Sequence, residues 1–427
     1  MCLYPKTNRG KPLNNSWYSA FAMDDVLLQK ANQLLQQYKV CDSCLGRLFR
    51  KDIRQGVNNA EKGSLIRQHL HWKQQTPTAE CWLCEGLLDE IPDFVILLTN
   101  ALQDYEYDTF LVGSKIDEDI QEREQRLWNT LELQDAEPIK MEINREIGKI
   151  LEPQLGKTVD IPNPEIMAVI DTRYNAVSLQ INSLFIYGRY KKFQRGIPQT
   201  KWPCSVCRGN GCKKCNYTGK LYDVTVEELT AQKALEFTKG TDESFHGSGR
   251  EDIDALMLGT GRPFVLEIKN PKKRNIDLAL LEKETNQMTK GKVEISSLRF
   301  SSREEIARIK AAEFRKTYRV TLEAAGTLNK EKLIKVAQTL RGKLIKQLTP
   351  TRVAHRRANK IRERTIYNCT IESVEGIIAR LLLETESGTY VKEFVSGDEN
   401  KTQPNLSELI GIPCRVIELD VIDVQGE

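Results

Sequence analysis

The stretch HGSGREDIDALMLGTGRPF, residues 246–264, decides how this sequence is interpreted. It contains four glycines on either side of a charged group: Gly247, Gly249, Gly259 and Gly261. Glycine lets the backbone bend sharply and lets a bulky ligand come close. Between the glycines, Arg250 lies two residues before Asp252, and a neighbouring guanidinium favours an ionised carboxylate. On spacing alone, the pair is either a reactive site in a flexible loop or an ordinary salt bridge.

The length and composition of the chain predict a multidomain globular protein. With 427 residues, 40% of them hydrophobic, the chain can build two or three separate cores. No apolar run approaches the roughly 20 residues that span a bilayer, and the N-terminal residues lack the apolar core of a secretion signal. We therefore expect a cytoplasmic protein that does not use a membrane as a partner.

Positive charge is concentrated in one part of the chain. The net charge is only +4, but residues 262–364 contain 27 Lys and Arg residues against 11 Asp and Glu residues. This segment therefore carries a charge of +16, and the remainder of the chain carries −12. A surface with such an excess attracts polyanions and releases counterions when they bind. The pattern favours a nucleic-acid partner, and a solvated basic surface without a partner is the alternative.

Eight of the eleven cysteines form four Cys-x-x-Cys pairs. The pairs are Cys41 and Cys44, Cys81 and Cys84, Cys204 and Cys207, and Cys212 and Cys215. Four thiolates suit the tetrahedral coordination of zinc, and a reducing compartment disfavours disulfides. We predict two structural zinc sites, one that joins the two distant pairs and one in a short glycine-rich hairpin. A redox-active pair is the alternative for the hairpin, although such a pair normally lies at a helix N-terminus.

Hydrophobic periodicity gives a coarse map of the first half of the chain. Helical spacing predicts a helix in residues 24–38 and one long exposed helix in residues 117–151. Alternation of β-branched residues predicts strands in residues 108–116 and 166–193. The segment YGRYKKFQRGIPQTKW, residues 187–202, interleaves aromatic and basic side chains. It predicts either a surface that stacks RNA bases or an amphipathic edge strand.

Helices and strands alternate from about residue 224 onward. The segments REEIARIKAAEFRK, residues 303–316, and EKLIKVAQTLRGKLIKQL, residues 331–348, have helical spacing. Between and after them lie strand-like segments such as PFVLEIKN and IIARLLLETES. The alternation predicts a large mixed sheet flanked by helices.

The charged loop resembles the catalytic loop of RNA pseudouridine synthases, whose G-R-x-D motif carries a single catalytic aspartate. The segment KTYRVTL, residues 316–322, resembles the tyrosine strand of these enzymes, and GTYVKEFVSGD, residues 388–398, resembles their basic motif. The first cysteine pairs and LVGSKI, residues 111–116, resemble a zinc-plus-THUMP accessory region. The combination is similar to the archaeal and eukaryotic tRNA pseudouridine synthases that modify T-loop uridines 54 and 55.

This resemblance implies a role for each matching residue. Asp252 would start cleavage of the glycosidic bond, with Arg250 beside it. Tyr318 would stack on the target uracil and remove its C5 proton. The aliphatic side chain of Val391 would cover the base, and Lys392 would pair with the aspartate.

The resemblance also implies residues that hold the RNA. Tyr390 would border the substrate, and Leu419 would be a second aliphatic cover. The segment TPTRVAHRRANKIRERTIY resembles a family signature, and its Arg356 and Arg357 would bind phosphates. After SGD the family continues with a Gly-Arg-Thr run, whereas this chain reads ENKTQPNL, which puts Lys401 in the place of the arginine.

The implied fold is α+β. It combines a pseudouridine-synthase-like catalytic domain, built on a large mixed or antiparallel sheet, with a zinc-binding α/β accessory domain that contains a THUMP domain. The expected boundaries are 1–23 for an unmatched N-terminal extension, 24–90 for the zinc-binding module, 91–200 for the THUMP-containing accessory domain, 201–222 for the second zinc hairpin and 223–427 for the catalytic domain.

The sequence therefore predicts an isomerase that converts uridine to pseudouridine in the T-loop of tRNA. The reaction needs no organic cofactor, and the target base must be flipped into a closed pocket. We expect tRNA as the partner and a monomeric protein. A non-catalytic zinc-dependent tRNA-binding protein is one alternative, and a THUMP-type tRNA-modifying enzyme of another chemistry is the second. The chain has no G-x-G-x-G loop after a strand and no P-loop, which disfavours chemistry that uses a nucleotide cofactor.

Overall fold

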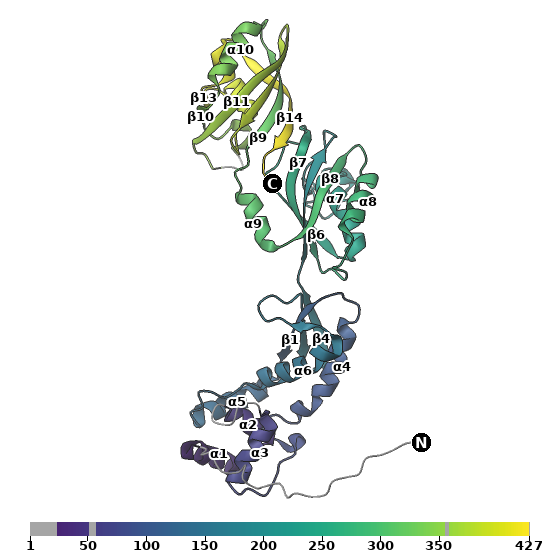
Figure 1. Cartoon of the computed structure of the whole chain (residues 1–427), viewed down its shortest axis with the longest axis vertical. Coiled ribbons are helices and arrows are strands. Elements are labelled where there is room, and N and C mark those ends of the chain that lie inside the picture. The colour runs from purple at the N-terminus through teal and green to yellow at the C-terminus, as the bar shows by residue number, and fades with distance from the viewer. Residues whose placement is uncertain (1–23, 51–56, 355–357, 427) are drawn as a thin grey trace, which may run out of the picture. The chain divides into compact units, whose positions relative to one another are not determined.

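The computed structural model describes residues 24–50, 57–354 and 358–426, and the chain divides into two compact units (Figure 1). Unit 1 comprises residues 1–180 and unit 2 comprises residues 181–427. Both units combine helices with a sheet, so the predicted α+β fold is confirmed. Within the described part of the chain, no helix has the length and the hydropathy that crossing a bilayer requires.

Unit 1 begins with three helices, α1 (Asp25–Gln37), α2 (Asp42–Leu48) and α3 (Asn59–His69). The side chain of Asp24 accepts a hydrogen bond from the backbone of Val26 and caps α1, which confirms the predicted helix in this segment. Asn58 and Glu61 form a reciprocal capping box at the start of α3. These caps fix the helix starts on either side of the first cysteine pair.

The rest of unit 1 is an α/β layer. Its elements are α4 (Ile91–Leu102), β1 (Thr109–Lys115), α5 (Glu118–Thr130), α6 (Ile139–Leu155), β2 (Thr158–Val159), β3 (Ile166–Asp171) and β4 (Ala176–Ile181). The strand order is β2-β1-β3-β4, with β1 parallel to both of its neighbours. The prediction of one long helix in residues 117–151 is wrong, because the chain forms two helices there. Pro138 precedes α6 and excludes a helical conformation at the residue before it.

Unit 2 is built on a ten-stranded sheet in the order β13-β10-β11-β12-β9-β14-β7-β5-β8, with β6 paired to β7. Its strands are β5 (Leu184–Lys192), β6 (Asp242–Gly247), β7 (Met257–Lys269), β8 (Val293–Ser301), β9 (Lys316–Ala324), β10 (Lys343–Gln347), β11 (Arg362–Glu375), β12 (Ile378–Thr385), β13 (Thr402–Gln403) and β14 (Cys414–Val424). The strands on either side of β14 form two halves, joined by a single parallel bridge between Val421 of β14 and Met257 of β7. The predicted large mixed sheet is confirmed.

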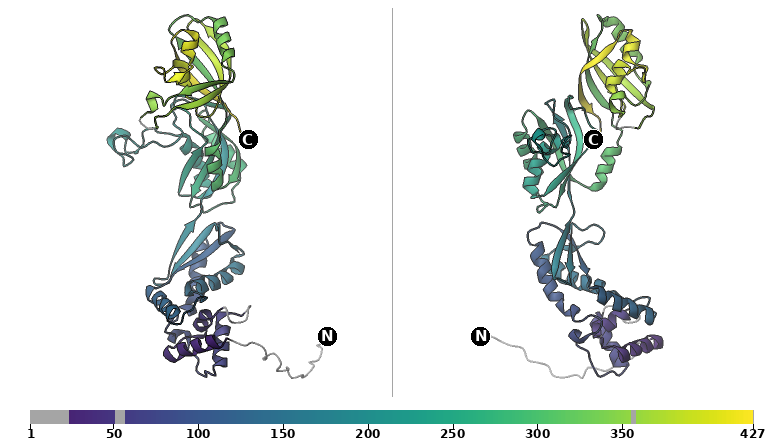
Figure 2. Two further views of the ribbon diagram at one scale, coloured as in Figure 1. Left: turned by 90° about the vertical axis from the view of Figure 1, so that its left-hand side faces the viewer. Right: turned by 180° about the vertical axis from the view of Figure 1, so that it is seen from behind.

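Helices cover this sheet. They are α7 (Val226–Thr238), α8 (Leu278–Met288), α9 (Arg303–Ala311), α10 (Lys330–Thr339), α11 (Val391–Ser396) and α12 (Leu406–Ile410). Helices α7 and α8 lie on one side of strands β5 to β8, and α9 lies on the other (Figure 1 and Figure 2). The two helices predicted in residues 303–316 and 331–348 are shorter than expected. The second ends before Gly342, which has a φ of +70°, and the chain then enters β10.

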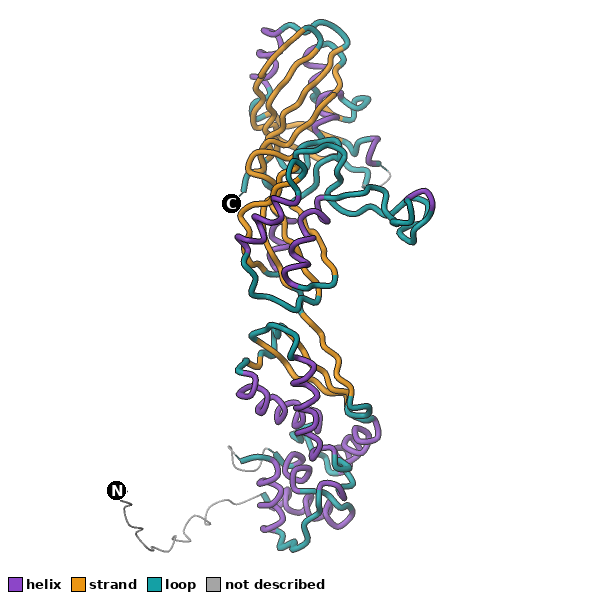
Figure 3. The backbone as a smooth tube through the Cα atoms, turned by 90° about the vertical axis from the view of Figure 1, so that its right-hand side faces the viewer, coloured by secondary structure: helices purple, strands orange, loops and turns teal. Residues whose placement is uncertain are grey.

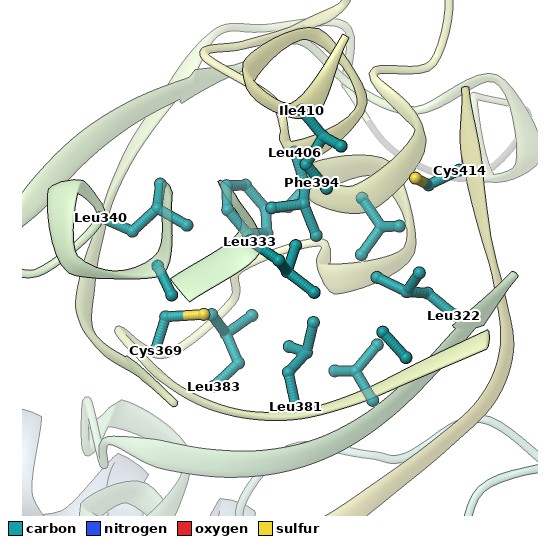
Figure 4. Packing of buried hydrophobic residues seen from close by; sticks show 14 of the residues in the cluster. Leu322, Leu333, Leu340, Cys369, Leu381, Leu383, Phe394, Leu406, Ile410 and Cys414 are labelled. Atoms are coloured by element: carbon teal, nitrogen blue, oxygen red, sulfur yellow. The ribbon is translucent and has the colours of Figure 1, made fainter. Parts of the chain in front are cut away.

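Two hydrophobic cores lie against the two halves of the sheet. In one, Phe394 of α11 lies among Leu322, Leu333, Leu381 and other aliphatic residues (Figure 4). The other core gathers β5, β6, β7 and β8 with α7 and α8. Tyr318 packs against both cores, so it lies where the two halves meet.

Strand β5 lies between β7 and the edge strand β8, so it is not the edge strand that was predicted as one alternative. Tyr187, Tyr190 and Lys192 are buried, so the residues of β5 itself do not form a base-stacking surface. Arg189 is also buried and donates to backbone carbonyls of β7 and of the C-terminal segment, including Gly261 and Val424. Residues 181–200 were expected in the accessory domain. In the structure they belong to unit 2, because β5 pairs with β7 in the sheet of that unit.

Candidate active site

A cavity of about 550 Å³ lies beside the junction of the two half-sheets. Its walls are the loop between β6 and β7, the first residues of β9 and β11, the middle of β14 and the segment that leads from β12 into α11. Seven predicted site residues line it: Arg250, Asp252, Tyr318, Tyr390, Val391, Lys392 and Leu419. Its volume is that of an ordinary small-ligand site. Arg356 and Arg357 lie outside the described residues.

The strand β7 brings this loop to the junction. Gly259 has a φ of +61°, and a Cβ atom there would lie 1.8 Å from the carbonyl oxygen of Ile422 in β14. Only glycine allows β7 and β14 to approach so closely. The glycine of the quoted stretch therefore sets the distance between the loop that carries Asp252 and the strand that carries Leu419.

Asp252 is held by two cations in the cavity. The Oδ2 atom of Asp252 lies 3.2 Å from Nζ of Lys392 and 3.6 Å from Nη1 of Arg352. The Asp252 side chain is still 35% exposed. The protein therefore holds the carboxylate by its cations and leaves it accessible to a ligand.

The same cations belong to a longer chain of alternating charges. Arg352 donates from Nε to Oε1 of the buried Glu393 at 2.5 Å, and Lys392 lies 3.1 Å from Oδ2 of Asp254. Burial alone would raise the pKa of Asp254, but the hydrogen bond and the charge of Lys392, together with the nearby Arg195, outweigh burial and lower it. Arg352 was not among the predicted site residues, although it belongs to the basic segment in residues 349–367 that resembles a family signature.

Arg250 does not pair with Asp252 among the described contacts. Its guanidinium instead lies 5.5 Å from the ring centroid of Trp202, in a cation–π arrangement. The expectation that Arg250 keeps the aspartate charged is therefore not met, because Lys392 and Arg352 occupy that position.

Glu251, the residue before Asp252, holds the loop against the sheet through buried contacts. Its buried carboxylate accepts from Nε of Arg262 at 2.9 Å and from the hydroxyl of Tyr190 at 2.8 Å. Gln199 donates both to that hydroxyl and to the carbonyl of Gly249. This network binds the Tyr190 hydroxyl and lies 4.0 Å from the Lys192 amine, so it accounts for the burial of these two β5 residues, and no sequence motif indicated it.

Lys316 and Tyr318 occupy alternate positions at the start of β9 and both line the cavity. Residues i and i+2 of a strand face the same side. Burial raises the pKa of Tyr318 to about 12, and the nearby Asp252 adds to this effect. Burial, with the nearby Arg262, lowers the pKa of Lys316 to about 7, so its amine is largely neutral above that pH. Among the described residues, this amine donates a hydrogen bond to the Ser387 hydroxyl, at 3.3 Å.

The segment Tyr390–Lys392 is positioned by a buried glutamine. Gln347 accepts from the backbone N–H of Tyr390 and donates to its carbonyl, both at 2.9 Å. The guanidinium of Arg362 lies 5.9 Å from the centroid of the Tyr390 ring. Lys401, which was expected in the place of the family arginine, hydrogen-bonds to Thr351 instead and is not among the residues that line the cavity.

The eight paired cysteines form two clusters of four. In each cluster the four Sγ atoms lie within 4.8 Å of one another, and pairs such as Cys41 with Cys84 and Cys207 with Cys215 are 3.9 and 3.7 Å apart. Four thiolates around one tetrahedral metal ion, at metal–sulfur distances of about 2.3 Å, would be about 3.8 Å apart. Both clusters can therefore hold a metal ion. His69 and His71, which lie between the first two cysteine pairs in the sequence, are exposed.

The two clusters differ in their surroundings. Cys41, Cys44, Cys81 and Cys84 are all buried, and the fully buried Arg47 donates to the Sγ atom of Cys44 at 3.6 Å. Arg47 also pairs with Glu124 of α5 and lies 3.7 Å from Glu142 of α6, so it connects this cluster to the α/β layer of unit 1. The second cluster lies in a partly exposed hairpin of unit 2.

Two families of known proteins match two separate parts of the chain. The family profile described as "Pus10, C-terminal" matches residues 185–425, and the one described as "Pus10 THUMP domain, archaeal" matches residues 95–171. A curated protein named "tRNA pseudouridine synthase Pus10" from Methanothrix thermoacetophila is 38% identical, over 97% of this chain and 98% of the relative. One of the same name from Methanothermobacter marburgensis is 41% identical, over 90% of this chain and 95% of the relative.

Solved structures resemble the chain only distantly. One, titled "Crystal Structure of a Cbf5-Nop10-Gar1 Complex", is 13% identical with a TM-score of 0.32 and covers 56% of this chain and 48% of its own. A similarity at this level adds nothing to the assignment. The sequence relatives and the geometry of the cavity carry it.

Proposed function

This chain belongs to the Pus10 family, and we propose that it is a tRNA pseudouridine synthase that isomerises uridine to pseudouridine. The observation that carries the proposal is the single cavity in which Asp252, Tyr318, Lys392 and Leu419 meet, although they lie far apart in the sequence. The named relatives support the substrate class.

In the proposed reaction the target uridine leaves the RNA stack and enters the cavity. The N1–C1′ bond of the nucleotide breaks, the uracil turns, a C5–C1′ bond forms, and the C5 proton moves to a base while N1 gains a proton. Asp252 starts this sequence either by attack of a carboxylate oxygen on C1′ or by removal of a C2′ proton. Lys392 and Arg352 hold the carboxylate in place, and Val391 and Leu419 cover the base and exclude water.

The C5 proton needs an acceptor, and two residues of β9 share that task. Tyr318 stacks on the uracil, but its raised pKa keeps the phenol protonated at neutral pH. Lys316 faces the same side of the strand, and its pKa of about 7 makes a large share of its amine neutral near pH 7, which suits a general base. We assign the proton to this pair, with the phenol in contact with the base and the amine as the final acceptor.

We further propose that the target uridines lie in the T-loop of tRNA, because the motifs resemble those of the T-loop-modifying enzymes. A cytoplasmic location and a monomeric state fit this substrate and stay predictions. The test is to incubate an unmodified tRNA transcript with purified protein and to map pseudouridine along it. Pseudouridine in the T-loop is the expected result. A modification that adds mass would indicate another chemistry, and binding without any modification would indicate a non-catalytic protein.

We also propose that both cysteine clusters hold zinc. Backbone N–H groups point at the thiolates, as from Cys41 to Cys81 Sγ at 3.2 Å and from Gly219 to Cys215 Sγ at 3.3 Å, which suits bound anionic sulfur. Metal analysis of purified protein should give two zinc ions per chain, and one or none would contradict the assignment. Removal of zinc with a chelator should unfold the helical part of unit 1, because metal binding and local folding are linked.

A further inference from the structure

A second cavity, of about 290 Å³, lies on the other side of the loop between β6 and β7. It shares Arg250, Asp252, Arg352 and Lys392 with the main cavity, so the two are continuous around the carboxylate of Asp252. Its outer wall is Trp202, which does not line the main cavity. The proposed isomerisation of one uridine does not use this space.

The wall of the second cavity is an aromatic platform. The Trp202 indole is half-buried, with its ring 5.9 Å from that of Tyr222 in an edge-to-face contact. The exposed guanidinium of Arg250 lies over the same indole. Indole rings and arginine planes are the surfaces on which nucleic-acid bases stack, whatever their sequence.

The second cysteine cluster fixes Trp202 in this position. The backbone carbonyl of Trp202 accepts from Leu221 at 2.9 Å, and Cys204 donates to Gly219 at 2.7 Å, so the two ends of the hairpin are joined next to the indole. An ion pair between Lys220 and Glu228 connects the hairpin to α7. Figure 3 shows the segment between β5 and α7 as mostly loop, with one short helical turn. The hairpin therefore holds one side of Trp202, and the hydrogen bond from the backbone of Lys201 to Glu227 of α7, at 2.9 Å, holds the other.

We propose that the second cavity is a subsite for the base of a nucleotide adjacent to the target uridine, and that the second cysteine cluster serves to position its Trp202 wall. This proposal rests on the proposed function. The second cavity has about half the volume of the main one, which suits one base beside a whole nucleotide. The shared Arg352 and Lys392 provide positive charge where the phosphate between the two nucleotides must pass.

The test combines protein and RNA changes. The tRNA is assembled with an abasic nucleotide on either side of the target uridine, and KM and kcat are measured for wild type and for Trp202→Leu. For the intact tRNA, Trp202→Leu should raise KM about tenfold, which corresponds to about 1.4 kcal/mol, with less effect on kcat. With the wild-type protein, one of the two abasic tRNAs should also have a KM about tenfold higher than that of the intact tRNA. With Trp202→Leu, the same abasic tRNA and the intact tRNA should have the same KM.

Two control variants separate stacking from damage to the hairpin. Tyr217→Ala removes an exposed aromatic of the same hairpin that lines neither cavity, and it should leave KM unchanged. Trp202→Phe keeps an aromatic face and should restore KM to within about threefold of wild type, with an unchanged zinc content. If Trp202→Phe raises KM as much as Trp202→Leu does, the subsite does not exist. The same conclusion follows if the effects of Trp202→Leu and of the abasic nucleotide on KM simply multiply.

The same experiment distinguishes failure of the subsite from failure of the proposed function. If wild type converts none of the RNAs, the proposed function is wrong. Wild type and Trp202→Leu are then compared again, with the dissociation constants of their complexes with the intact and the abasic tRNAs in place of KM. Coupling between Trp202 and a neighbouring base in these constants supports the subsite without any turnover, and additive effects reject it.

Discussion

The loop between β6 and β7 has two faces, and they differ in what their carboxylates contact. On the side of the sheet, Glu251 is 7% exposed and bonds to Arg262 and Tyr190, which are themselves buried. On the side of the cavity, the Asp252 side chain is 35% exposed and shares its cations with Glu393 and Asp254. Neighbouring residues of one short loop therefore have opposite surroundings.

The difference shows how a loop can hold a reactive carboxylate in position and still leave it accessible to a substrate. Glu251 uses both of its oxygens on buried partners and fixes the backbone of the loop. Asp252 contacts only cations that also line the cavity, and its side chain stays partly exposed. Changes on the sheet side should therefore cost stability, and changes on the cavity side should cost turnover.

The largest effect on stability is expected for Glu251→Leu. The substitution leaves the guanidinium of Arg262 buried without its carboxylate, which should lower the free energy of unfolding by about 3–5 kcal/mol. Urea unfolding measures this change. The double variant Glu251→Leu/Arg262→Met removes both charges and should recover much of the loss. If the single variant unfolds like wild type, Glu251 does not anchor the loop.

Lys316→Met should stabilise the protein in a pH-dependent way. The pKa of Lys316 is about 7 in the folded protein against an ordinary 10.5, so below pH 7 the folded state carries a buried ammonium that the unfolded state carries in water. This penalty is fully present below pH 7 and is relieved as pH rises from 7 towards 10.5. The variant should therefore gain about 2–4 kcal/mol at pH 6 and much less at pH 10. A gain that does not depend on pH would mean that the ammonium is not desolvated.

Tyr318→Phe tests whether Tyr318 serves stability or turnover, because this residue packs on both cores and also lines the cavity. Its unfolding free energy should change by less than about 1 kcal/mol, since the hydroxyl forms no hydrogen bond with another residue in the described part of the chain. Product formation should fall by at least about a hundredfold while tRNA binding persists, because the hydroxyl takes part in proton transfer. Near-normal turnover would reduce Tyr318 to a stacking platform.

The sequence predicted the cavity side of the loop better than the sheet side. Asp252, Tyr318 and Leu419 lie in motifs that resemble a known family, and the structure brings them to one cavity. The same is true of the two cysteine clusters, because ligand spacing is a local property of the chain. Residues that act chemically leave short motifs that can be recognised without the fold.

The sheet side could not be predicted because burial depends on distant pairing. Lys192 and Tyr190 look like a basic, aromatic surface until β7 and β8 enclose β5 and Glu251 meets them in the core. The helix expected to run through Gly342 ends earlier, because the pairing of β10 with β11 overrides its helical spacing. Arg352 reaches Asp252 only through the tertiary fold.

The smallest change in stability and the largest change in turnover are both expected for Asp252→Asn. The amide keeps the size of the side chain, so the unfolding free energy should change by less than about 0.5 kcal/mol. The affinity for tRNA should stay within about tenfold, or about 1.4 kcal/mol, because Lys392 and Arg352 remain to face the RNA.

The most direct measurement is the yield of pseudouridine in an unmodified tRNA transcript incubated with Asp252→Asn and, in parallel, with wild type. Wild type should form pseudouridine, and the variant should bind the transcript and form none. Pseudouridine formed by Asp252→Asn at the wild-type rate would contradict the central claim that this cavity is the active site and Asp252 its reactive carboxylate.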